Sequence, residues 1–258
     1  MIEESTIRSL HVEAMRRGDL GEGHDDHALF QASTVSALLD GAYEGDLTFA
    51  ELAVEGDTGI GTLNGLDGEM IAIDGRFYRA DANGFASEID PGVRTPFAVV
   101  TRFSADRRMD LDGRLDLAEL EAFLDRDLDE APVAVYRIEG RFTRVRARSV
   151  PRQEPPYRPL VEVVAKQNVF ELGPAEGFLI GFRFPVWAEG VEIGGYHFHF
   201  IDRDLERGGH VLDLSLDSGS VQVQHADDLH VELPPGLELT SPDLAAETHE
   251  AIDRAEHG

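Results

Sequence analysis

The chain has 258 residues, enough for one large domain or two smaller ones with a sizeable core. It contains no cysteine, which excludes thiolate metal sites, disulfides and cysteine nucleophiles. The formal net charge of −27 argues against nucleic acid and anionic membrane surfaces as partners, because both would repel the protein. The acidic start has no apolar run of signal length, and no segment approaches the ~20 apolar residues that span a bilayer. We therefore expect a cytoplasmic protein.

The N-terminal half begins with a polar stretch and then changes from helical to strand-like patterns. Residues 1–27 are polar and charged, so we expect a flexible N-terminal arm there. The patterns that follow predict two short helices and then four strands, at 33–39, 48–54, 59–63, 69–73, 77–80 and 97–103. Asp74-Gly75 separates two apolar-rich runs, which indicates a tight hairpin.

An acidic segment precedes the next predicted helix. Asp110–Glu119 resembles part of an EF-hand calcium loop, but Arg108 stands where the first ligand should be an aspartate. We therefore interpret the segment as an acidic turn before a helix. Apolar residues with helical spacing predict that helix over 115–128.

The remaining sequence is mostly strand-like. Residues 133–150 have the pattern of a second hairpin that turns at Glu139-Gly140, and the prolines of 151–159 indicate a connection between two halves. Further strands are expected at 161–165, 178–184, 196–200, 211–215 and 220–224. Ser241-Pro242 has the N-cap and first-turn residues of a C-terminal helix.

Three histidines form the most informative pattern of the chain. His197 and His199 alternate with aromatic residues, and alternate side chains of a strand point to one face. The polar segment 202–209 ends in two glycines and predicts a turn, so His210 would open the return strand. Such a hairpin brings three imidazoles together, and three protein nitrogens leave coordination positions open, as in a catalytic metal site. Ordinary surface or core histidines are the alternative interpretation.

One other histidine pattern, and one other interpretation of the His-x-His pair, compete with this metal site. His24-Asp25-Asp26-His27 could bind a metal, although a place in the N-terminal arm is the simpler interpretation. The His-x-His pair also resembles the cupin metal motif. A glutamate should follow that pair in a cupin, where this chain has Arg203 and Asp204.

Five segments, in the same order, resemble the α-acetolactate decarboxylase family. The segments are Gln31–Gly41, Gly59–Glu69, Arg148–Glu154, Gly195–Phe200 and Gly208–Asp213. Within the second segment Leu63 replaces the usual phenylalanine, which is a small apolar change. The resemblance runs from about Phe30 to about Glu256, nearly the whole chain.

The resemblance implies both a fold and a site. The implied fold is α+β, with two β-rich subdomains of mixed sheets and few helices, usually in a homodimer. We place the subdomains at 28–150 and 151–258, with the metal site at a β-hairpin of the second. The implied site has a zinc ion held by His197, His199 and His210, and a pocket lined by Thr62, Glu69 and Arg148. A glutamate near the C-terminus should reach the same site; Glu256 fits best, and Glu250 is the competing choice.

The resemblance also implies a carboxy-lyase that converts (S)-2-acetolactate to (R)-acetoin and CO2, in acetoin biosynthesis and the butanediol pathway. Zinc would stabilise the enediolate left by CO2, and Glu69 would protonate it stereospecifically. Arg148 would hold the substrate carboxylate or hydroxyl, and Thr62 would hydrogen-bond a substrate oxygen. Glu256 would be a fourth ligand or a pocket cap. Without the resemblance, Glu69 and Arg148 would be interpreted as an ordinary surface ion pair.

Two competing functions follow from the same residues. One is a cupin-like mononuclear metal oxygenase or isomerase, which redox-active iron in the isolated protein would favour over zinc. The other is a protein that binds a metal or a metabolite without turnover.

Overall fold

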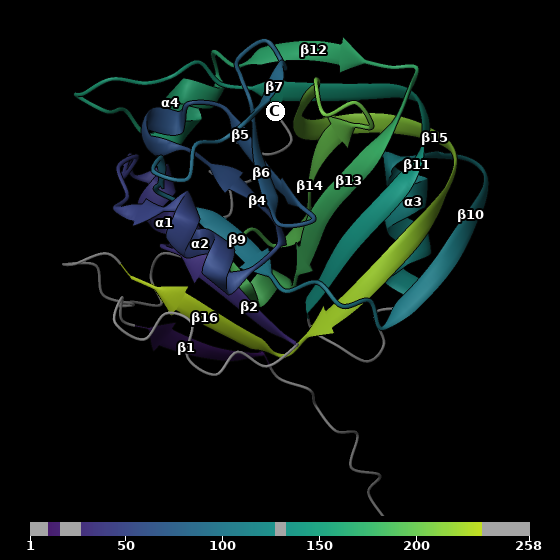
Figure 1. Ribbon diagram of the computed structural model, residues 1–258, viewed down its shortest axis with the longest axis horizontal. Helices are drawn as coiled ribbons and strands as arrows, with labels where there is room; N and C mark the ends of the chain where they lie inside the picture. The colour runs from purple at the N-terminus through teal and green to yellow at the C-terminus, as the bar shows by residue number, and fades with distance from the viewer. Residues whose placement is uncertain (1–9, 16–26, 127–132, 234–258) are drawn as a thin grey trace, which may run out of the picture.

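Two β-sheets make up most of the protein, which we describe from a computed structural model over residues 10–15, 27–126 and 133–233 (Figure 1). The first sheet has eight strands and is mixed, because β1, β16 and β2 run parallel and the other neighbours antiparallel. In sheet order its strands are β1 (His11–Met15), β16 (Asp228–Glu232), β2 (Ala28–Ala32), β9 (Ala98–Thr101), β4 (Thr58–Thr62), β5 (Glu69–Ile73), β6 (Arg76–Ala80) and β7 (Ala86–Glu88).

The second sheet has six antiparallel strands and closes on itself. In sheet order they are β10 (Arg107–Asp116), β15 (Gly208–Ala226), β14 (Gly195–Asp202), β13 (Ala175–Phe184), β11 (Val133–Ser149) and β12 (Asn168–Leu172). Because β15 also pairs with β11, strands β11, β13, β14 and β15 form a ring. A separate pair joins β3 (Leu47–Thr48) to β8 (Arg94–Thr95).

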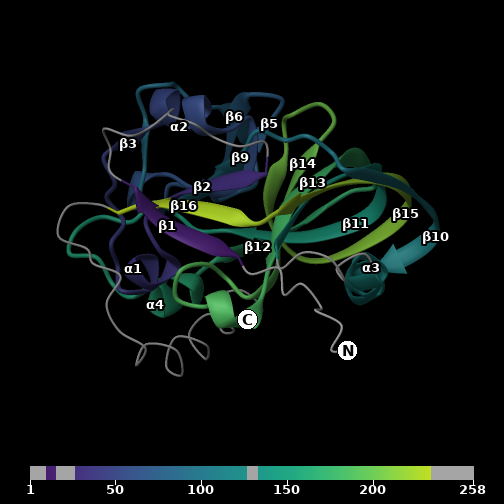
Figure 2. The ribbon, with the colours of Figure 1, turned by 90° about the horizontal axis from the view of Figure 1, so that it is seen from below.

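Besides the strands, the described residues form four short α-helices and two named 3₁₀-helices. They are α1 (Val35–Leu39), α2 (Phe49–Glu55), α3 (Leu117–Leu124), α4 (Leu160–Val164), η2 (Asn64–Leu66) and η4 (Val186–Ala188). Capping boxes begin two of them, with Thr48 and Glu51 at α2 and Asp116 and Glu119 at α3. Figure 2 shows α1 and α4 at one end of the molecule and α3 at the other, beside β10. None of the described helices is long and apolar enough to cross a bilayer.

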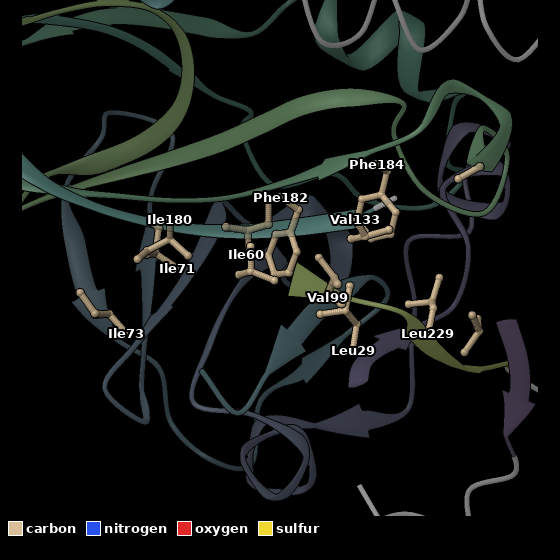
Figure 3. Packing of buried hydrophobic residues seen from close by; sticks show 14 of the residues in the cluster. Leu29, Ile60, Ile71, Ile73, Val99, Val133, Ile180, Phe182, Phe184 and Leu229 are labelled. Carbon is tan, nitrogen blue, oxygen red and sulfur yellow. The ribbon is translucent and has the colours of Figure 1, made fainter. Parts of the chain in front are cut away.

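The two sheets pack face to face through a shared apolar core. Ile60 and Ile71 of the first sheet pack with Ile180 and Phe182 of the second, and all four side chains are fully buried (Figure 3). A second core fills the space between the closed strands and α3 and includes Phe200. The first core holds the facing surfaces of the two sheets together, which matters because the candidate site is built from both.

The fold class expected from the resemblance is confirmed, since the protein is β-rich with mixed sheets and few helices. The predicted helices at 33–39, 48–54 and 115–128 correspond to α1, α2 and α3, and the Asp74-Gly75 hairpin joins β5 to β6.

The predicted turn at Glu139-Gly140 was wrong, because β11 runs straight through it. Gly140 pairs with Gly177 on one side and Gly219 on the other. A Cβ on Gly140 would lie 2.6 Å from Leu216 Cδ1 and 2.8 Å from the Ser218 carbonyl oxygen. The glycine therefore allows β15 to approach closely, and it does not mark a turn.

Three other local predictions also differ from the structure. Residues 161–165 lie largely in α4, because short apolar runs do not distinguish a strand from a buried helix. The strands predicted at 211–215 and 220–224 are one continuous strand, β15. The acidic segment before α3 belongs to β10 and is not a turn.

The sheets divide the chain at a different place from the expected subdomain boundary at 150. Strands β10 and β11 precede that position and belong to the second sheet, whereas β16 follows it and belongs to the first. Within the expected arm, β1 pairs with β16, and residues 1–9 and 16–26 lie outside the described residues. The helix expected to begin at Ser241-Pro242 also lies outside them.

Candidate metal centre and active site

Three buried histidines of β14 and β15 meet on the face of the second sheet that is turned toward the first. His197 and His199 share one face of β14, while Phe198 and Phe200 on the other face are buried in the second core. His199 is paired directly with His210 across the two strands. One ring nitrogen from each histidine lies within 4.8 Å of the others, and His197 Nε2 is 3.1 Å from His210 Nδ1. The three side chains could therefore hold one metal ion.

The orientation of His199 is fixed from the first sheet. Its Nδ1 lies 2.8 Å from the carbonyl oxygen of Met70, on β5. A carbonyl oxygen can only accept, so Nδ1 carries the proton of the neutral ring and Nε2 carries the lone pair. A backbone acceptor behind the ring is the usual support of a metal-binding histidine.

Arg148 lies in the same row of the second sheet. It is paired with His210 across β11 and β15, and His210 is in turn paired with His199 across β15 and β14. Directly opposed residues of neighbouring strands share a face, so the three side chains project toward the first sheet together.

Thr62 and Glu69 face this row from the first sheet, where they are paired across β4 and β5. Glu69 Oε2 lies 3.6 Å from His199 Nε2, and Glu69 Oε1 lies 4.0 Å from Arg148 Nη1. Both charged side chains are buried, so a role as an ordinary surface ion pair does not fit. A buried carboxylate requires compensating positive charge, which the guanidinium supplies on one side.

One pocket unites these polar groups with an apolar wall. It spans about 530 Å³ of empty space, including its open mouth, and its polar lining consists of Thr62, Glu69, Arg148 and the three histidines. The apolar lining comes from α1, η2, α4 and nearby segments and comprises Val35, Leu38, Leu66, Phe97, Val150, Leu160 and Ile193. The arrangement suits a small molecule that has both charged or hydroxyl groups and short alkyl groups.

The turn between Thr62 and Glu69 is anchored from outside the pocket. Asn64 exchanges two hydrogen bonds with the backbone of Gly45, at 2.9 and 2.8 Å, and the Gly65 amide donates to the Tyr43 carbonyl at 2.8 Å. Burial raises the pKa of the Tyr43 phenol, whose hydroxyl donates to the Arg158 carbonyl and so stays neutral. These bonds limit the movement of the turn that leads into Glu69.

The donor set fits a divalent metal such as zinc. The lone pair on His199 Nε2 and the Glu69 carboxylate face each other at 3.6 Å, and a nearby cation would relieve their repulsion. Three imidazoles suit several first-row metals, and the chain has no thiolate to compete with them.

The structure brings six of the expected site residues to one pocket, namely Thr62, Glu69, Arg148, His197, His199 and His210. Glu256 and Glu250, the two choices for a C-terminal carboxylate, lie outside the described residues. Sequence reasoning missed the backbone oxygen of Met70 and the apolar wall. The sequence predicted a short helix over 33–39, but nothing in the pattern indicated that this helix borders a pocket.

The fold and the pocket together define a class of protein. It is a β-rich protein in which two packed sheets enclose a three-histidine group able to hold a metal ion, beside a buried carboxylate and a guanidinium. This combination is typical of an enzyme that acts on a small polar molecule.

Comparison with known proteins identifies the family. The sequence model described as alpha-acetolactate decarboxylase matches residues 29–246, so the chain belongs to the alpha-acetolactate decarboxylase family. Members with that name are carboxy-lyases. The chain is 42% identical to the alpha-acetolactate decarboxylase of Methylococcus capsulatus, over 97% of this chain and 99% of that protein. It is 35% identical to that of Bacillus subtilis, over 92% and 95% of the two chains.

Solved structures agree with this assignment. The crystal structure of alpha-acetolactate decarboxylase from Bacillus subtilis superposes with a TM-score of 0.84 and 36% identity, covering 90% of this chain and all of that one. A Staphylococcus aureus protein described as similar to alpha-acetolactate decarboxylase superposes with a TM-score of 0.81 and 31% identity, covering 87% of this chain and 99% of that one. The family resemblance is therefore confirmed, and the cupin-like alternative is not favoured.

Proposed function

We propose that the protein catalyses zinc-dependent decarboxylation of (S)-2-acetolactate to (R)-acetoin and CO2. The observation that carries the proposal is the meeting of three buried imidazoles with Glu69 and Arg148 in one pocket. The pocket belongs to a chain of a family whose name specifies acetolactate as the substrate and decarboxylation as the reaction.

We assign the three-histidine site to zinc. His197, His199 and His210 would be its protein ligands, which leaves coordination positions open for a substrate. When bound, zinc supplies positive charge that stabilises the negative charge developing on a substrate oxygen as CO2 leaves.

Arg148 and Thr62 would bind and orient the substrate. The guanidinium of Arg148 offers a two-pronged donor for the carboxylate or the hydroxyl, and its place opposite His210 puts that group beside the metal site. The Thr62 hydroxyl donates to the Gly68 carbonyl at 2.8 Å, so it would offer its lone pairs to a substrate hydroxyl. The apolar wall would hold the methyl groups and exclude water.

Glu69 is the group that we assign to proton delivery. Loss of CO2 breaks the bond between the carboxyl carbon and the hydroxyl-bearing carbon, and the electron pair left behind forms an enediolate. The Glu69 carboxylate would first take the proton of the substrate hydroxyl and, after CO2 has left, return it to one face of that carbon, because it is fixed on one side of the pocket. A proton from solvent would then restore the hydroxyl, so that one proton is consumed for each CO2 released. Glu256 would act as a fourth ligand or a cap, with Glu250 as the competing choice.

The proposed reaction is tested by acetoin release from 2-acetolactate, measured by a colour assay before and after zinc is stripped with a chelator. Acetoin should form, disappear with the chelator and return with added zinc. A folded, zinc-loaded protein that releases no acetoin in low or high salt would contradict the proposal. Restoration of activity by iron and not by zinc would contradict the assignment of the metal.

We further propose that the enzyme works in the cytoplasm as a homodimer, without nucleic acid or membrane as partners. The charge of −27 supports the absence of anionic partners, because it would repel them. Sedimentation of the purified protein tests the dimer, since the monomer has a mass of 28.4 kDa.

A further inference from the structure

We propose that Thr95 is a positioning residue for the reaction proposed above, on which this inference rests. Its side chain does not line the pocket, and the residue is only 1% exposed, in β8 behind the pocket wall. Its hydroxyl is hydrogen-bonded to the backbone carbonyls of two residues that line the pocket, Thr62 and Phe97. Thr95 thereby fixes Thr62, in the polar lining of the pocket, relative to Phe97, in the apolar lining.

The contacts of Thr95 converge on one hydroxyl. Its Oγ1 lies 2.8 Å from the Thr62 carbonyl oxygen and 2.9 Å from the Phe97 carbonyl oxygen, so one proton is shared between two acceptors. The same oxygen accepts a hydrogen bond from the Phe97 amide at 3.2 Å. The Thr62 amide donates to the Phe97 carbonyl at 3.0 Å. These bonds tie the end of β4 to the start of β9.

The restraint continues from Thr62 to Glu69. The Thr62 hydroxyl donates to the Gly68 carbonyl at 2.8 Å, and Gly68 immediately precedes Glu69. Thr62 and Glu69 are also paired across β4 and β5. The position of the Glu69 backbone is therefore fixed by a series of bonds that begins at Thr95.

The reaction is sensitive to this position because Glu69 works at short range. Its two carboxylate oxygens lie 3.6 and 4.0 Å from His199 Nε2 and Arg148 Nη1. Misplacing a reacting group by about 1 Å can cost roughly 100-fold in rate. Removal of the Thr95 hydroxyl takes a donor from a region without solvent to replace it, so the end of β4 would shift.

The test compares Thr95→Val with a matched control, Thr101→Val. Thr101 is also 1% exposed and uses its hydroxyl in the same way, donating to the Ala28 carbonyl at 3.0 Å and accepting from Gln224 at 3.0 Å. It does not line the pocket. Both variants lose one buried hydroxyl at nearly constant volume, but only Thr95→Val breaks the series of bonds that leads to Glu69.

For Thr95→Val we expect a fall in kcat of about 10-fold, with zinc content and KM close to those of the parent. The enantiomeric excess of acetoin should fall as well, because a displaced Glu69 no longer protonates one face. Thr95→Ser should have the kcat and the enantiomeric excess of the parent. Thr101→Val should also keep both, even if its melting temperature falls as far as that of Thr95→Val. If Thr95 had only a structural role, Thr95→Val would lower the melting temperature without lowering kcat and the enantiomeric excess at unchanged KM and zinc content.

Parent-like kcat and enantiomeric excess in folded Thr95→Val would overturn the inference, as would equal losses in Thr101→Val. If Thr95→Val does not fold, Thr95→Cys replaces the hydroxyl with a weak donor and should show a smaller loss of both values. Parent-like behaviour of that variant would count against the inference. If the parent releases no acetoin, the proposed function fails. Crystal structures still decide the inference, because Glu69 should be displaced in Thr95→Val and unmoved in Thr101→Val.

Discussion

The two halves of the site are built in different ways. The metal half comes from two consecutive strands, β14 and β15, in which His199 and His210 are directly paired and His197 is two residues away. The half that carries Glu69 comes from β4 and β5 of the other sheet. Neighbours on a hairpin thus provide the three histidines, whereas only the packing of two sheets brings Glu69 to them.

This difference should separate the proposed metal binding from the proposed turnover. The histidine cluster needs little beyond its own hairpin and the Met70 carbonyl behind His199. The proton transfer proposed for Glu69 would need the core that holds the sheets together, because Glu69 reaches His199 and Arg148 only across it. Substitutions in the two halves should therefore have different effects on zinc content and on rate.

Substitution of a histidine should have the largest effect. His199→Ala removes one of three nitrogens, and we expect both bound zinc and acetoin formation to be lost. Zinc content by atomic absorption and the acetoin assay check this result. His11→Ala, at a histidine whose side chain is 68% exposed, is the control and should change neither quantity. Full zinc occupancy in His199→Ala would contradict the assignment of this ligand.

Substitution of Glu69 should separate the two properties. Glu69→Gln keeps the shape of the side chain but removes its acid function, so we expect normal zinc content and a rate lower by about 10²–10⁴-fold. Glu88→Gln, at an exposed glutamate of the same sheet that pairs with Arg76, should leave both unchanged. A nearly normal rate in Glu69→Gln would remove this residue from proton transfer.

Thr95→Val has the smallest expected effect of the series, because it acts on Glu69 only through the backbone of Thr62. Together the three variants should give a graded comparison. His199→Ala should lose the metal, and Glu69→Gln should keep the metal but lose the carboxyl group. Thr95→Val should keep both, with the Glu69 carboxyl group displaced.

The metal half could be predicted from the sequence because its geometry is local. Alternation within β14 places two histidines on one face, and a short turn returns the chain to His210. Glu69 and Arg148 were assigned through the family resemblance alone. Their proximity depends on the packing of two sheets, which no local pattern reports.

Other features could not be predicted, for physical reasons. Gly140 has the appearance of a turn residue, but its missing side chain serves a close strand crossing that depends on Leu216, far along the chain. Thr95 has no sequence signal, because a buried threonine that bonds to backbone carbonyls has no characteristic spacing. The apolar wall combines residues from separate segments, which only the fold brings together.

The chirality of the acetoin tests the central claim most directly, namely that Glu69 protonates from the first sheet a substrate held at the metal site of the second. Chiral gas chromatography of the early product, against the racemic acetoin of the uncatalysed reaction, measures it. We predict a large excess of the (R) enantiomer. Enzyme-dependent formation of racemic acetoin would contradict the account, because protonation would then come from solvent.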